Sequence, residues 1–510
     1  MMTTITPAEM KELETRFMEE NHIPGALLME HAALGVVDAI ARYTDKGDVV
    51  FLCGPGNNGG DGYAAARLWA ARGGKSHIVE VTADVHGDAL LNRQKALEAG
   101  IPCEIASDDA FFDLPRCDVI VDALFGTGLA RPISGAAGHI IHCAYDMNLD
   151  FGTPILAVDI PSGIDGTTGK NLGCAIRATE TVTFHRIKQG LLLNDAPDHV
   201  GKITVQPIGI PLLGDINIDY KGMTVLAPID LDSGLFIRPQ TCHKGDFGRV
   251  VLFCGSRGMA GAAALCANAA MRSGAGLTTI LCRESLLPIL QTLAPGAMCA
   301  VLPERDGMLM PESVDIARNA LAKADAACIG CGLRQTDDLL PVLRLFAEAD
   351  CPVVWDADAL NLLAKQNDIL PLKESDIITP HPGEAARLLD CNADEVADDA
   401  LAALHRLHVK YGCTVLLKGA RSLITDGVDT CCNLYTSPAL AKGGSGDVLA
   451  GIITALLARR IALLDSVDAA AYGAMIHGLA GVRAAKKYGE NCTLPTDIVD
   501  CIRLDSKGID

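Results

Sequence analysis

Short apolar runs, often β-branched, recur along the first half of the chain, and turns with glycine and alanine-rich, helix-like segments follow them. GDVVFLC at 47–53 precedes AAARLWAARG at 64–73, and CDVIVDALF at 117–125 precedes AGHIIHCAYDM at 137–147. Continuous apolar runs of this length favour strands that are buried on both faces. The alternation therefore predicts parallel βαβ units.

The same alternation begins again after residue 240. Its apolar runs are GRVVLFC, LTTILC, ADAACIG, PVVWDA, SDIITP and TVLLKG, and the helix-like AAALCANAAMRSG follows the first of them. Between the two halves, residues 207–240 lack helical periodicity and are rich in Pro, Gly and Asp. We therefore predict an α/β protein with two three-layer α/β/α domains in tandem, residues 1–218 and residues 219–510.

Length and charge agree with two domains and restrict the partners. The chain has 510 residues, 49% of them hydrophobic and 21% charged, and a net charge of −20. This charge disfavours a nucleic-acid or anionic-membrane surface, so a phosphate-bearing ligand is expected to be held by local backbone amides. The best candidate for a membrane span, residues 448–464, is interrupted by Arg459 and Arg460.

The cysteines and the N-terminus indicate the compartment. The 19 cysteines are scattered, odd in number and mostly embedded in apolar runs, which favours reduced thiols over a disulfide scaffold. The N-terminal MMTTITPAEMKELETRF has neither the basic nor the apolar region of a signal peptide. We expect a cytoplasmic protein.

The segment GPGNNGGDG, residues 54–62, lies between an apolar run and a helix-like segment. It contains G-x-G-x-x-G, and Glu80 follows at the separation of a ribose-binding acid, so one interpretation is a dinucleotide-binding dehydrogenase. Against it, Pro55 lacks an amide donor and Asp61 would repel a pyrophosphate. The asparagines at 57–58 and a carboxylate instead supply the hard oxygens that suit an alkali or alkaline-earth cation. A third interpretation is that they only cap a helix.

Two further glycine-rich turns begin with an aspartate at the end of an apolar run, DALFGTGLARPISG at 122–135 and DIPSGIDGTTG at 159–169. Because ligands collect at the carboxyl ends of strands in an open parallel sheet, we expect all three turns at one crevice. With HIPGALLMEHAA near the N-terminus, this ordered run of motifs resembles the NAD(P)H-hydrate epimerases over residues 8–215. The resemblance implies a Rossmann-like first domain that interconverts the R and S forms of NADHX and NADPHX, the hydrated nicotinamide nucleotides.

The same resemblance implies the site residues of the first domain. The hydrated nucleotide is expected to contact Asn57, Asn58, Gly59, Gly60, Asp61, Gly126, Thr127, Gly128, Leu129, Ala130, Arg131, Pro132 and Asp159. Asp159 is also expected to be catalytic. A potassium ion is expected on Asn58, Asp122 and Ser162, in agreement with the oxygen-donor interpretation of the loop. One departure is Glu30-His31-Ala32-Ala33, where the family usually has Glu-Asn-Ala-Gly.

In the second domain, AKGGSGDVLAGII at 441–453 is a glycine turn that leads into an apolar helix. Free amides at such a helix start bind phosphate with the help of the helix dipole. The sequence has no G-x-x-x-x-G-K-[ST], which argues against a Walker-type NTPase. Asp447 stands next to the expected phosphate, where it is either a base or a helix cap.

This segment and four others, GCGLRQ, WDADALNLL, ITPHPGEAARLL and LLKGARSLITDG, follow HKGDFGRVVLFCGSRGMAGAAALCANAAMRSGAGL in the chain. The series resembles the ADP- or ATP-dependent NAD(P)H-hydrate dehydratases of the ribokinase-like superfamily, over residues 225–505. By that resemblance, Asp447 is the base that acts on the C6 hydroxyl of the hydrate. The expected hydrate contacts are Gly261, Gly332, His381 and Asp447. The expected nucleotide and phosphoryl contacts are Lys418, Gly419, Ala420, Arg421, Ser422, Gly444, Ser445 and Gly446.

We therefore expect a bifunctional repair enzyme, an epimerase and a nucleotide-dependent dehydratase, which acts as a homo-oligomer. Phosphorylation of the C6 hydroxyl makes a leaving group, and loss of phosphate restores the dihydronicotinamide ring. ADP, converted to AMP and phosphate, is the expected co-substrate, with ATP as the alternative and Mg²⁺ as the accompanying ion. Two other functions stay open: a kinase of a vitamin precursor or sugar fused to an oxidoreductase domain, and a kinase-like half fused to a non-catalytic module.

Two motifs of the second domain have competing interpretations. His381 lies in PHPGE, where two prolines predict a strand-to-helix loop, and we favour a substrate contact over a solvated side chain. Cys328 and Cys331 form C-x-x-C, but no second pair at zinc-site spacing accompanies them in the sequence. We therefore favour small buried hydrophobes over a redox or zinc site.

The motif WDADALN also has two interpretations. Asp356, Asp358 and Asn361 form either a metal cluster or the capped start of a helix that begins at Ala359. Nothing else in the sequence separates the two, so the role of both aspartates stays open.

Overall fold

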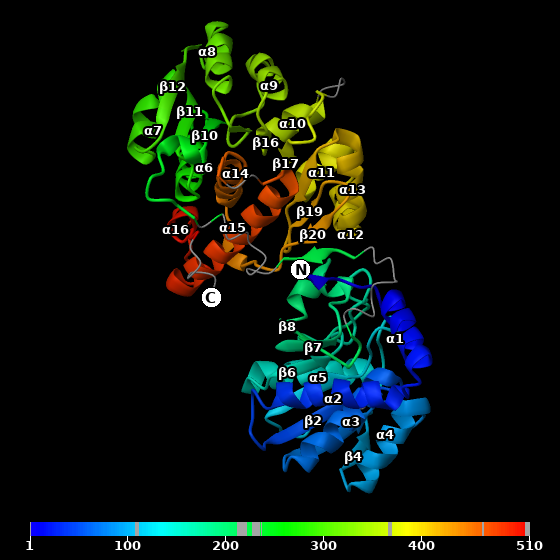
Figure 1. Cartoon of the computed structure of the whole chain (residues 1–510). Helices are drawn as coiled ribbons and strands as arrows, with labels where there is room; N and C mark the ends of the chain where they lie inside the picture. Colours follow the sequence, from blue (N-terminus) through cyan, green and yellow to red (C-terminus); the bar gives the residue numbers. More distant parts are fainter. Residues whose placement is uncertain are drawn as a thin grey trace. The chain divides into compact units, whose positions relative to one another are not determined.

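The computed structural model describes residues 2–107, 112–211, 222–226, 235, 237–365, 370–461 and 464–504. The chain divides into two compact units, Met2–Met223 and Thr224–Asp510 (Figure 1). The domain boundary expected between residues 218 and 219 lies outside the described residues.

The first unit is built on a parallel sheet with the strand order β4-β3-β2-β5-β6-β7-β8. Its strands are β2 (Asp48–Cys53), β3 (Lys75–Glu80), β4 (Cys103–Ile105), β5 (Val119–Ala123), β6 (Ile155–Val158), β7 (Glu180–Phe184) and β8 (Lys202–Gln206). Its helices are α1 (Pro7–Asn21), α2 (Gly25–Ile40), α3 (Asn57–Ala71), α4 (Gly87–Glu98) and α5 (Ala136–Phe151). A short strand, β1 (Met2–Thr3), precedes them.

Alternate residues of β2 face opposite layers of helices. Phe51 belongs to the core that includes residues of α2, α3 and α4, whereas Leu52 belongs to the core that includes residues of α5. This is the period of two that a strand imposes on its side chains. The apolar run therefore covers both faces, and the first unit has the predicted three α/β/α layers.

The strand order changes direction between β2 and β5. From β2 the chain continues through β3 to β4 on one side, and then returns to β5 and β6 on the other. At such a switch point the connections leave the carboxyl ends of two neighbouring strands in opposite directions, which leaves room for a ligand. The GPGNNGGDG and DALFGTG segments begin at these two strand ends.

The second unit contains a sheet in the order β9-β20-β19-β18-β17-β16-β15-β10-β11-β12. Its strands are β9 (Thr224–Val225), β10 (Arg249–Phe253), β11 (Leu277–Arg283), β12 (Met298–Leu302), β15 (Ala326–Ile329), β16 (Val353–Trp355), β17 (Ile377–Ile378), β18 (Thr414–Leu417), β19 (Leu423–Thr425) and β20 (Thr430–Cys432). Only β19 is antiparallel to its neighbours in this series. A separate antiparallel pair joins β13 (Glu304–Arg305) and β14 (Met308–Leu309).

Helices cover both faces of this sheet as well. They are α6 (Ala260–Arg272), α7 (Leu287–Leu293), α8 (Glu312–Leu321), α9 (Leu340–Ala347), α10 (Asp358–Lys365), α11 (Pro382–Leu389), α12 (Ala393–Asp398), α13 (Ala400–Tyr411), α14 (Ser445–Leu457), α15 (Ser466–Tyr488) and α16 (Pro495–Asp500). Leu252 of β10 lies in the core with residues of α6, α14 and α15, whereas Phe253 stacks on Phe346 of α9, with ring centroids 6.2 Å apart. The second unit is therefore also a three-layer sandwich.

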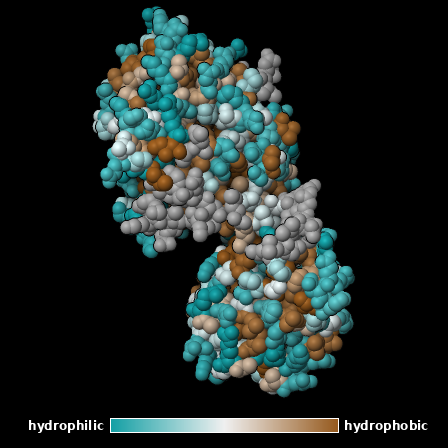
Figure 2. Space-filling view, in the orientation of Figure 1, coloured by the Kyte–Doolittle hydropathy of each residue, from teal (hydrophilic) through white to brown (hydrophobic). Residues whose placement is uncertain are grey.

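Most of the visible surface of each unit is hydrophilic, with hydrophobic residues in small groups (Figure 2). None of the described helices combines the length and the apolar character that a bilayer span requires.

Candidate functional site

The loop after β2 carries the start of α3 to the switch point of the first unit. Gly56 is the N-cap of α3, and the amides of the first turn, from Asn57 onward, lack intrahelical acceptors. A Cβ on Gly54 would overlap the carbonyl oxygen of Leu124, and a Cβ on Gly59 would overlap that of Gly54. Close backbone packing thus requires two of the three glycines of G-x-G-x-x-G, and the free amides provide an anion site.

Asp122 and Ser162 form a fully buried oxygen cluster at the ends of β5 and β6. Asp122 Oδ1 accepts from Ser162 Oγ at 2.6 Å, and Asp122 Oδ2 accepts from Ser162 N at 2.8 Å. Burial raises the pKa of Asp122 to about 6, and the bonds from Ser162 limit this rise. The ionised form of Asp122 therefore predominates at neutral pH.

Asn58 is the third residue expected at this cluster. Its amide nitrogen is buried and has no hydrogen-bond partner. A Cβ on Gly126 would lie 3.0 Å from its Oδ1, so the turn after β5 lies directly against Asn58. An amide with one unpartnered end can turn its oxygen toward a cation, and together with a carboxylate and a hydroxyl it makes a set of hard donors that suits an alkali ion.

Asp159 follows β6 in the left-handed backbone region, with φ 62°. Its Oδ1 accepts from Lys188 Nζ at 2.6 Å, Thr183 Oγ1 at 3.0 Å and Phe184 N at 3.3 Å. Lys188 is 1% exposed and also donates to the carbonyl oxygen of Phe184 at 2.8 Å. The strained backbone and the buried ion pair hold the Asp159 carboxylate in one position.

Two further carboxyl groups are electrostatically coupled to this ion pair. Burial, with the charges of Asp159 and Glu14, raises the pKa of Asp61 well above its usual range. Burial also raises the pKa of Glu14 to about 7, with Lys188 opposing the rise. The raised pKa of Asp61 favours its neutral form and so weakens the predicted repulsion between it and a pyrophosphate. Neither Glu14 nor Lys188 was predicted as a site residue from the sequence, because their place beside Asp159 results from contacts between distant segments.

Glu80 does not serve as a ribose-binding acid. It is 1% exposed and accepts from Arg93 Nη2 at 2.6 Å, Arg93 Nε at 2.7 Å and Tyr63 OH at 2.9 Å. These bonds occupy both carboxylate oxygens inside the unit. The simplest dehydrogenase interpretation of the loop is therefore wrong.

The remaining expected residues of the first unit lie around the same strand ends. Asn57 is exposed, Gly60 is buried, and the turn over residues 126–132 has Thr127, Gly128, Ala130, Arg131 and Pro132 exposed, with Gly126 and Leu129 half-buried. The variant segment Glu30-His31 lies within α2, where Glu30 pairs with Arg67 at 2.5 Å and His31 Nδ1 lies 3.0 Å from Ile208 O. The unusual histidine therefore leaves the helix intact.

In the second unit, Asp447 lies in the first turn of α14, directly after the glycine turn. Gly444 has φ 102°, a conformation that favours glycine. The N-cap of α14 is Gly444, so Asp447 is not the N-cap residue and lies at the third position of the helix. Burial, with Cys331 and Asp356 nearby, raises the pKa of Asp447 to about 9. A strongly perturbed carboxyl group beside free helix amides is typical of a catalytic site.

Asp356 lies between Asp447 and Lys418, the first residue of the segment expected to contact the nucleotide. Asp356 Oδ1 accepts from Lys418 Nζ at 2.7 Å and from Thr379 Oγ1 at 2.8 Å. One oxygen of Asp356, one of Asp447 and the sulfur of Cys331 all lie within 4.8 Å of one another. A Cβ on Gly446 would lie 3.5 Å from Lys418 Nζ, so the lysine also borders the glycine turn. Asp356 therefore lies among the residues expected at the dehydratase site.

His381 lies in the predicted loop between β17 and α11, where it is the helix N-cap. Its Nδ1 accepts from Gly383 N at 3.0 Å, and its backbone N donates to Glu384 Oε2 at 2.9 Å. Glu384 Oε2 lies 3.8 Å from Lys418 Nζ, which connects His381 to the Lys418–Asp356 pair. Half of the His381 side chain is exposed, and its Nε2 lies 3.5 Å from Glu384 Oε1.

The other residues predicted for the second unit lie at three places. A Cβ on Gly332 would lie 2.9 Å from Ala262 Cβ, so Gly332 lies beside the start of α6, where Gly261 is exposed. Ser445 Oγ lies 3.1 Å from His477 Nε2, and burial lowers the pKa of His477 to about 4. The Ser445 hydroxyl therefore faces a neutral histidine inside the unit. Gly419, Ala420, Arg421 and Ser422 form the turn between β18 and β19.

WDADALN contains the start of a helix, as one of the two interpretations expected, one residue before Ala359. Helix α10 begins at Asp358, whose carboxylate accepts from Arg334 N at 2.8 Å and Gln335 Nε2 at 3.1 Å. Asn361 Oδ1 accepts from Arg387 Nε at 2.7 Å. Asp356 is bonded to Lys418 instead. The three side chains therefore have different partners and do not form one metal cluster.

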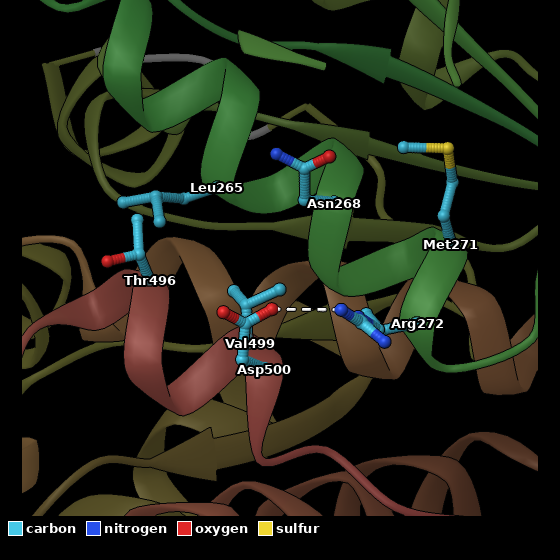
Figure 3. A pocket seen from close by; sticks show the side chains of 7 residues that line it. All are labelled: Leu265, Asn268, Met271, Arg272, Thr496, Val499 and Asp500. Carbon is cyan, nitrogen blue, oxygen red and sulfur yellow. Dashed lines mark hydrogen bonds and ion pairs between the residues drawn. The ribbon is translucent and has the colours of Figure 1, made fainter. Parts of the chain in front are cut away.

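A surface pocket lies between α6 and α16, and residues of these two helices line it (Figure 3). Arg272 and Asp500 form an ion pair at its wall, with Nη2 and Oδ1 2.9 Å apart. None of the residues predicted for a site lines this pocket.

Comparison with known proteins gives two matches to families. Residues 25–190 match the family described as YjeF-related protein N-terminus, and residues 250–504 match the family described as NAD(P)H-hydrate dehydratase. The bifunctional NAD(P)H-hydrate repair enzyme of Coxiella burnetii is 35% identical, over 97% of this chain and 98% of that protein. The enzyme of the same name from Escherichia coli is 37% identical, over 91% of this chain and 86% of that protein.

A solved structure resembles the second unit. A ribokinase-like superfamily protein from Enterococcus faecalis matches 56% of this chain and 96% of its own, at 29% identity and a TM-score of 0.50. The predicted ribokinase-like fold of the second domain is thus confirmed.

Proposed function

The chain belongs to the family of bifunctional NAD(P)H-hydrate repair enzymes, and from that premise we propose a division of the two reactions between its two units. The first unit interconverts (R)- and (S)-NAD(P)HX. The second dehydrates (S)-NAD(P)HX to NAD(P)H with a nucleotide as phosphoryl donor. The proposed domains extend over residues 1–218 and 219–510.

The position of Asp447 carries the dehydratase assignment. Its carboxyl group lies at the first turn of α14, next to the glycine turn and within the cluster that contains Asp356 and Cys331. A phosphoryl group on the amides of Gly446 and its neighbours would place its acceptor hydroxyl next to this carboxylate. In its ionised form, which the positive charge of Lys418 favours, Asp447 would then remove the proton of the C6 hydroxyl as that hydroxyl attacks phosphorus.

Lys418 would also support this reaction. Its ammonium lies beside both Asp356 and the glycine turn, where it offsets charge on the nucleotide phosphates. We propose ADP as the donor, giving AMP and phosphate, with Mg²⁺ on its phosphates. The turn over residues 419–422 extends from Lys418 and would contact the same nucleotide.

In the first unit, the switch-point edge would hold the hydrated nucleotide between the start of α3 and the turn over residues 126–132. We propose that Asn58, Asp122 and Ser162 bind K⁺, because they are hard oxygen donors and the Asn58 amide has an unpartnered buried end. Such an ion would bring positive charge close to the nucleotide phosphate. Asp159, held by Lys188, is the proposed proton-transfer group.

A reducing compartment is also part of the proposal. All of the cysteines, 19 in number, are free thiols. Extracellular proteins of this cysteine content normally form disulfides, so the free thiols support a cytoplasmic location.

An R/S mixture of NADHX or NADPHX tests the function directly. Recovery of NAD(P)H absorbance is followed with ADP, ATP or no nucleotide, each with K⁺ or with an organic monovalent cation in its place. We expect complete conversion with ADP and K⁺, conversion of the S form alone when the epimerase lacks K⁺, and none without nucleotide. Release of ADP from ATP with a hydroxymethylpyrimidine or a sugar, without NAD(P)H formation, would instead identify a kinase.

A further inference from the structure

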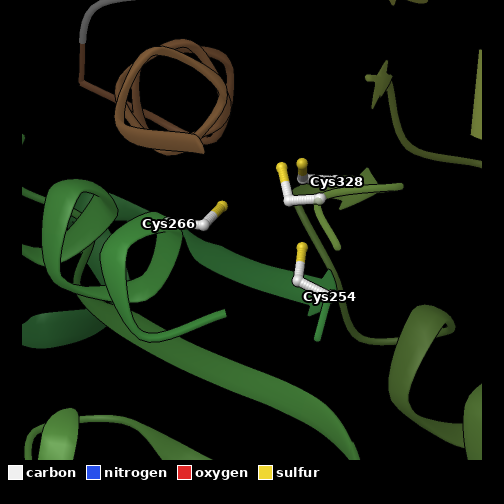
Figure 4. A group of neighbouring side chains, drawn as sticks. Cys254, Cys266 and Cys328 are labelled. Atoms are coloured by element: carbon white, nitrogen blue, oxygen red, sulfur yellow. The ribbon is translucent and has the colours of Figure 1, made fainter. Parts of the chain in front are cut away.

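Four cysteine side chains meet inside the second unit. Cys254 follows β10, Cys266 lies in α6, Cys328 lies in β15 and Cys331 follows β15. Their sulfur atoms all lie within 4.8 Å of one another, and the four residues are completely buried. Figure 4 shows the side chains of Cys254 and Cys266 directed toward Cys328. The second cysteine pair that the sequence analysis did not find therefore comes from segments far away in the chain.

The spacing of the sulfurs suits tetrahedral coordination. Thiolates on Zn²⁺ lie about 2.3 Å from the metal and about 3.8 Å from one another. Since no two of the sulfurs are more than 4.8 Å apart, a regular tetrahedron of this size would place each at most about 2.9 Å from its centre. Each sulfur would then move inward by at most about 0.6 Å to reach ligand distance, a shift within the reach of small χ1 adjustments.

Backbone hydrogen bonds hold the positions of these cysteines. Gly255 N donates to Cys331 O at 2.8 Å, and Gly330 N donates to Phe253 O at 3.2 Å, so the ends of β10 and β15 are joined next to the cluster. Helix α6 packs against β10 and α14 and carries Cys266 into the same core. The four side chains therefore come from rigid elements, as a preorganised metal site requires.

We propose that Cys254, Cys266, Cys328 and Cys331 bind one thiophilic divalent ion of the zinc class. Four S–H groups lose their protons and four metal–sulfur bonds form, with no change of oxidation state. The ion offsets two of the four thiolate charges. Lys418 lies near the site, where its charge is paired with Asp356.

The ion would also connect the cluster to the dehydratase site. In the metal-free chain the Cys331 thiol donates to Asp356 Oδ2 at 3.7 Å. Metal binding removes this proton, while Asp356 keeps its bonds from Lys418 and Thr379. Cys331 would then be a metal ligand, and the metal would fix the chain segment next to Asp447. This inference goes beyond the proposed repair function and does not depend on it.

Metal analysis of the full-length, untagged protein tests the proposal. The protein is produced in medium with added zinc, and its metal content is measured by mass spectrometry. We expect about one zinc ion per chain. The double variant C254S/C266S is expected to lose it, and the matched control C282S/C299S, which removes a neighbouring cysteine pair from β11 and β12, is expected to keep it.

Cobalt keeps the test decisive if C254S/C266S does not fold. Wild-type protein produced with Co²⁺ is expected to have strong thiolate-to-cobalt charge-transfer bands and the visible bands of tetrahedral Co²⁺. Folded wild-type protein without zinc or cobalt would overturn the proposal. So would equal metal content in C254S/C266S and the control, or disulfide bonds among the four cysteines in unreduced protein.

Discussion

Lys418 and Asp356 form an ion pair, with Nζ and Oδ1 2.7 Å apart, at the point where the glycine turn of the second unit meets the ends of its strands. Asp356 is 2% exposed, so its charge depends on this partner. Burial raises the pKa of Asp356, and Lys418 opposes the rise. The pair thereby connects the stability of the second unit with the charge state of its candidate active site.

Removing the lysine should destabilise the second unit. In Lys418→Met the buried carboxylate loses its counter-charge, and we expect the free energy of unfolding to fall by about 3 kcal/mol. Denaturant unfolding followed by circular dichroism measures the change. Arg272→Met is the matched control, because its ion pair with Asp500 is exposed and should contribute less than about 1 kcal/mol. Equal losses in both variants would contradict the role of Lys418 in holding a buried charge.

Asp447→Asn should abolish nucleotide-dependent dehydration and leave epimerisation intact. The amide has nearly the same shape but cannot accept the hydroxyl proton, so we expect a loss of about 10²-fold to 10⁴-fold in kcat. NAD(P)H formation from purified (S)-NADPHX with ADP measures the first activity, and conversion of the R form the second. Dehydration at the wild-type rate would exclude Asp447 as the base.

The stability of the second unit should depend on pH through Asp447. A carboxyl pKa of about 9 in the folded chain exceeds the unfolded value, so the folded state binds this proton more tightly. The contribution is complete at low pH and is lost as pH rises toward the folded pKa. Between these two pKa values, the free energy of unfolding of Asp447→Asn should therefore rise relative to wild type, by at most about 1.4 kcal/mol per pH unit. A constant difference across this range would contradict the raised pKa.

Asp159→Asn should stop epimerisation while dehydration of the S form continues. Asparagine tolerates the left-handed backbone at this position, so the loop should keep its conformation. We expect epimerisation to fall by about 10²-fold or more, because the amide cannot transfer the proton and leaves Lys188 without its counter-charge. Interconversion of the two epimers followed by chromatography measures the rate. Asp165→Asn, a change in a nearby turn, is the control, and a similar loss there would point to a general effect on the loop.

The positions of the longer strands along the chain follow closely from the local sequence. The run GDVVFLC forms β2, because a short continuous apolar run is typical of a strand that is buried on both faces. The glycine-rich segment after it leads into α3. The two prolines beside His381 likewise predicted the loop before α11. Short strands such as β19 and β20 were not predicted separately, since three-residue segments carry too little periodicity.

By itself the sequence determined the α/β architecture and the two glycine turns at helix starts, with Asp61 in the first and Asp447 directly after the second. These features depend on residues close together in the chain, where periodicity and turn chemistry act. Tertiary structure alone decided that Lys188 pairs with Asp159, that Asp356 pairs with Lys418, that Glu80 is occupied by Arg93 and Tyr63, and that four cysteines converge. Each of these depends on which strand ends lie side by side, and on how far burial removes a charge or a thiol from water.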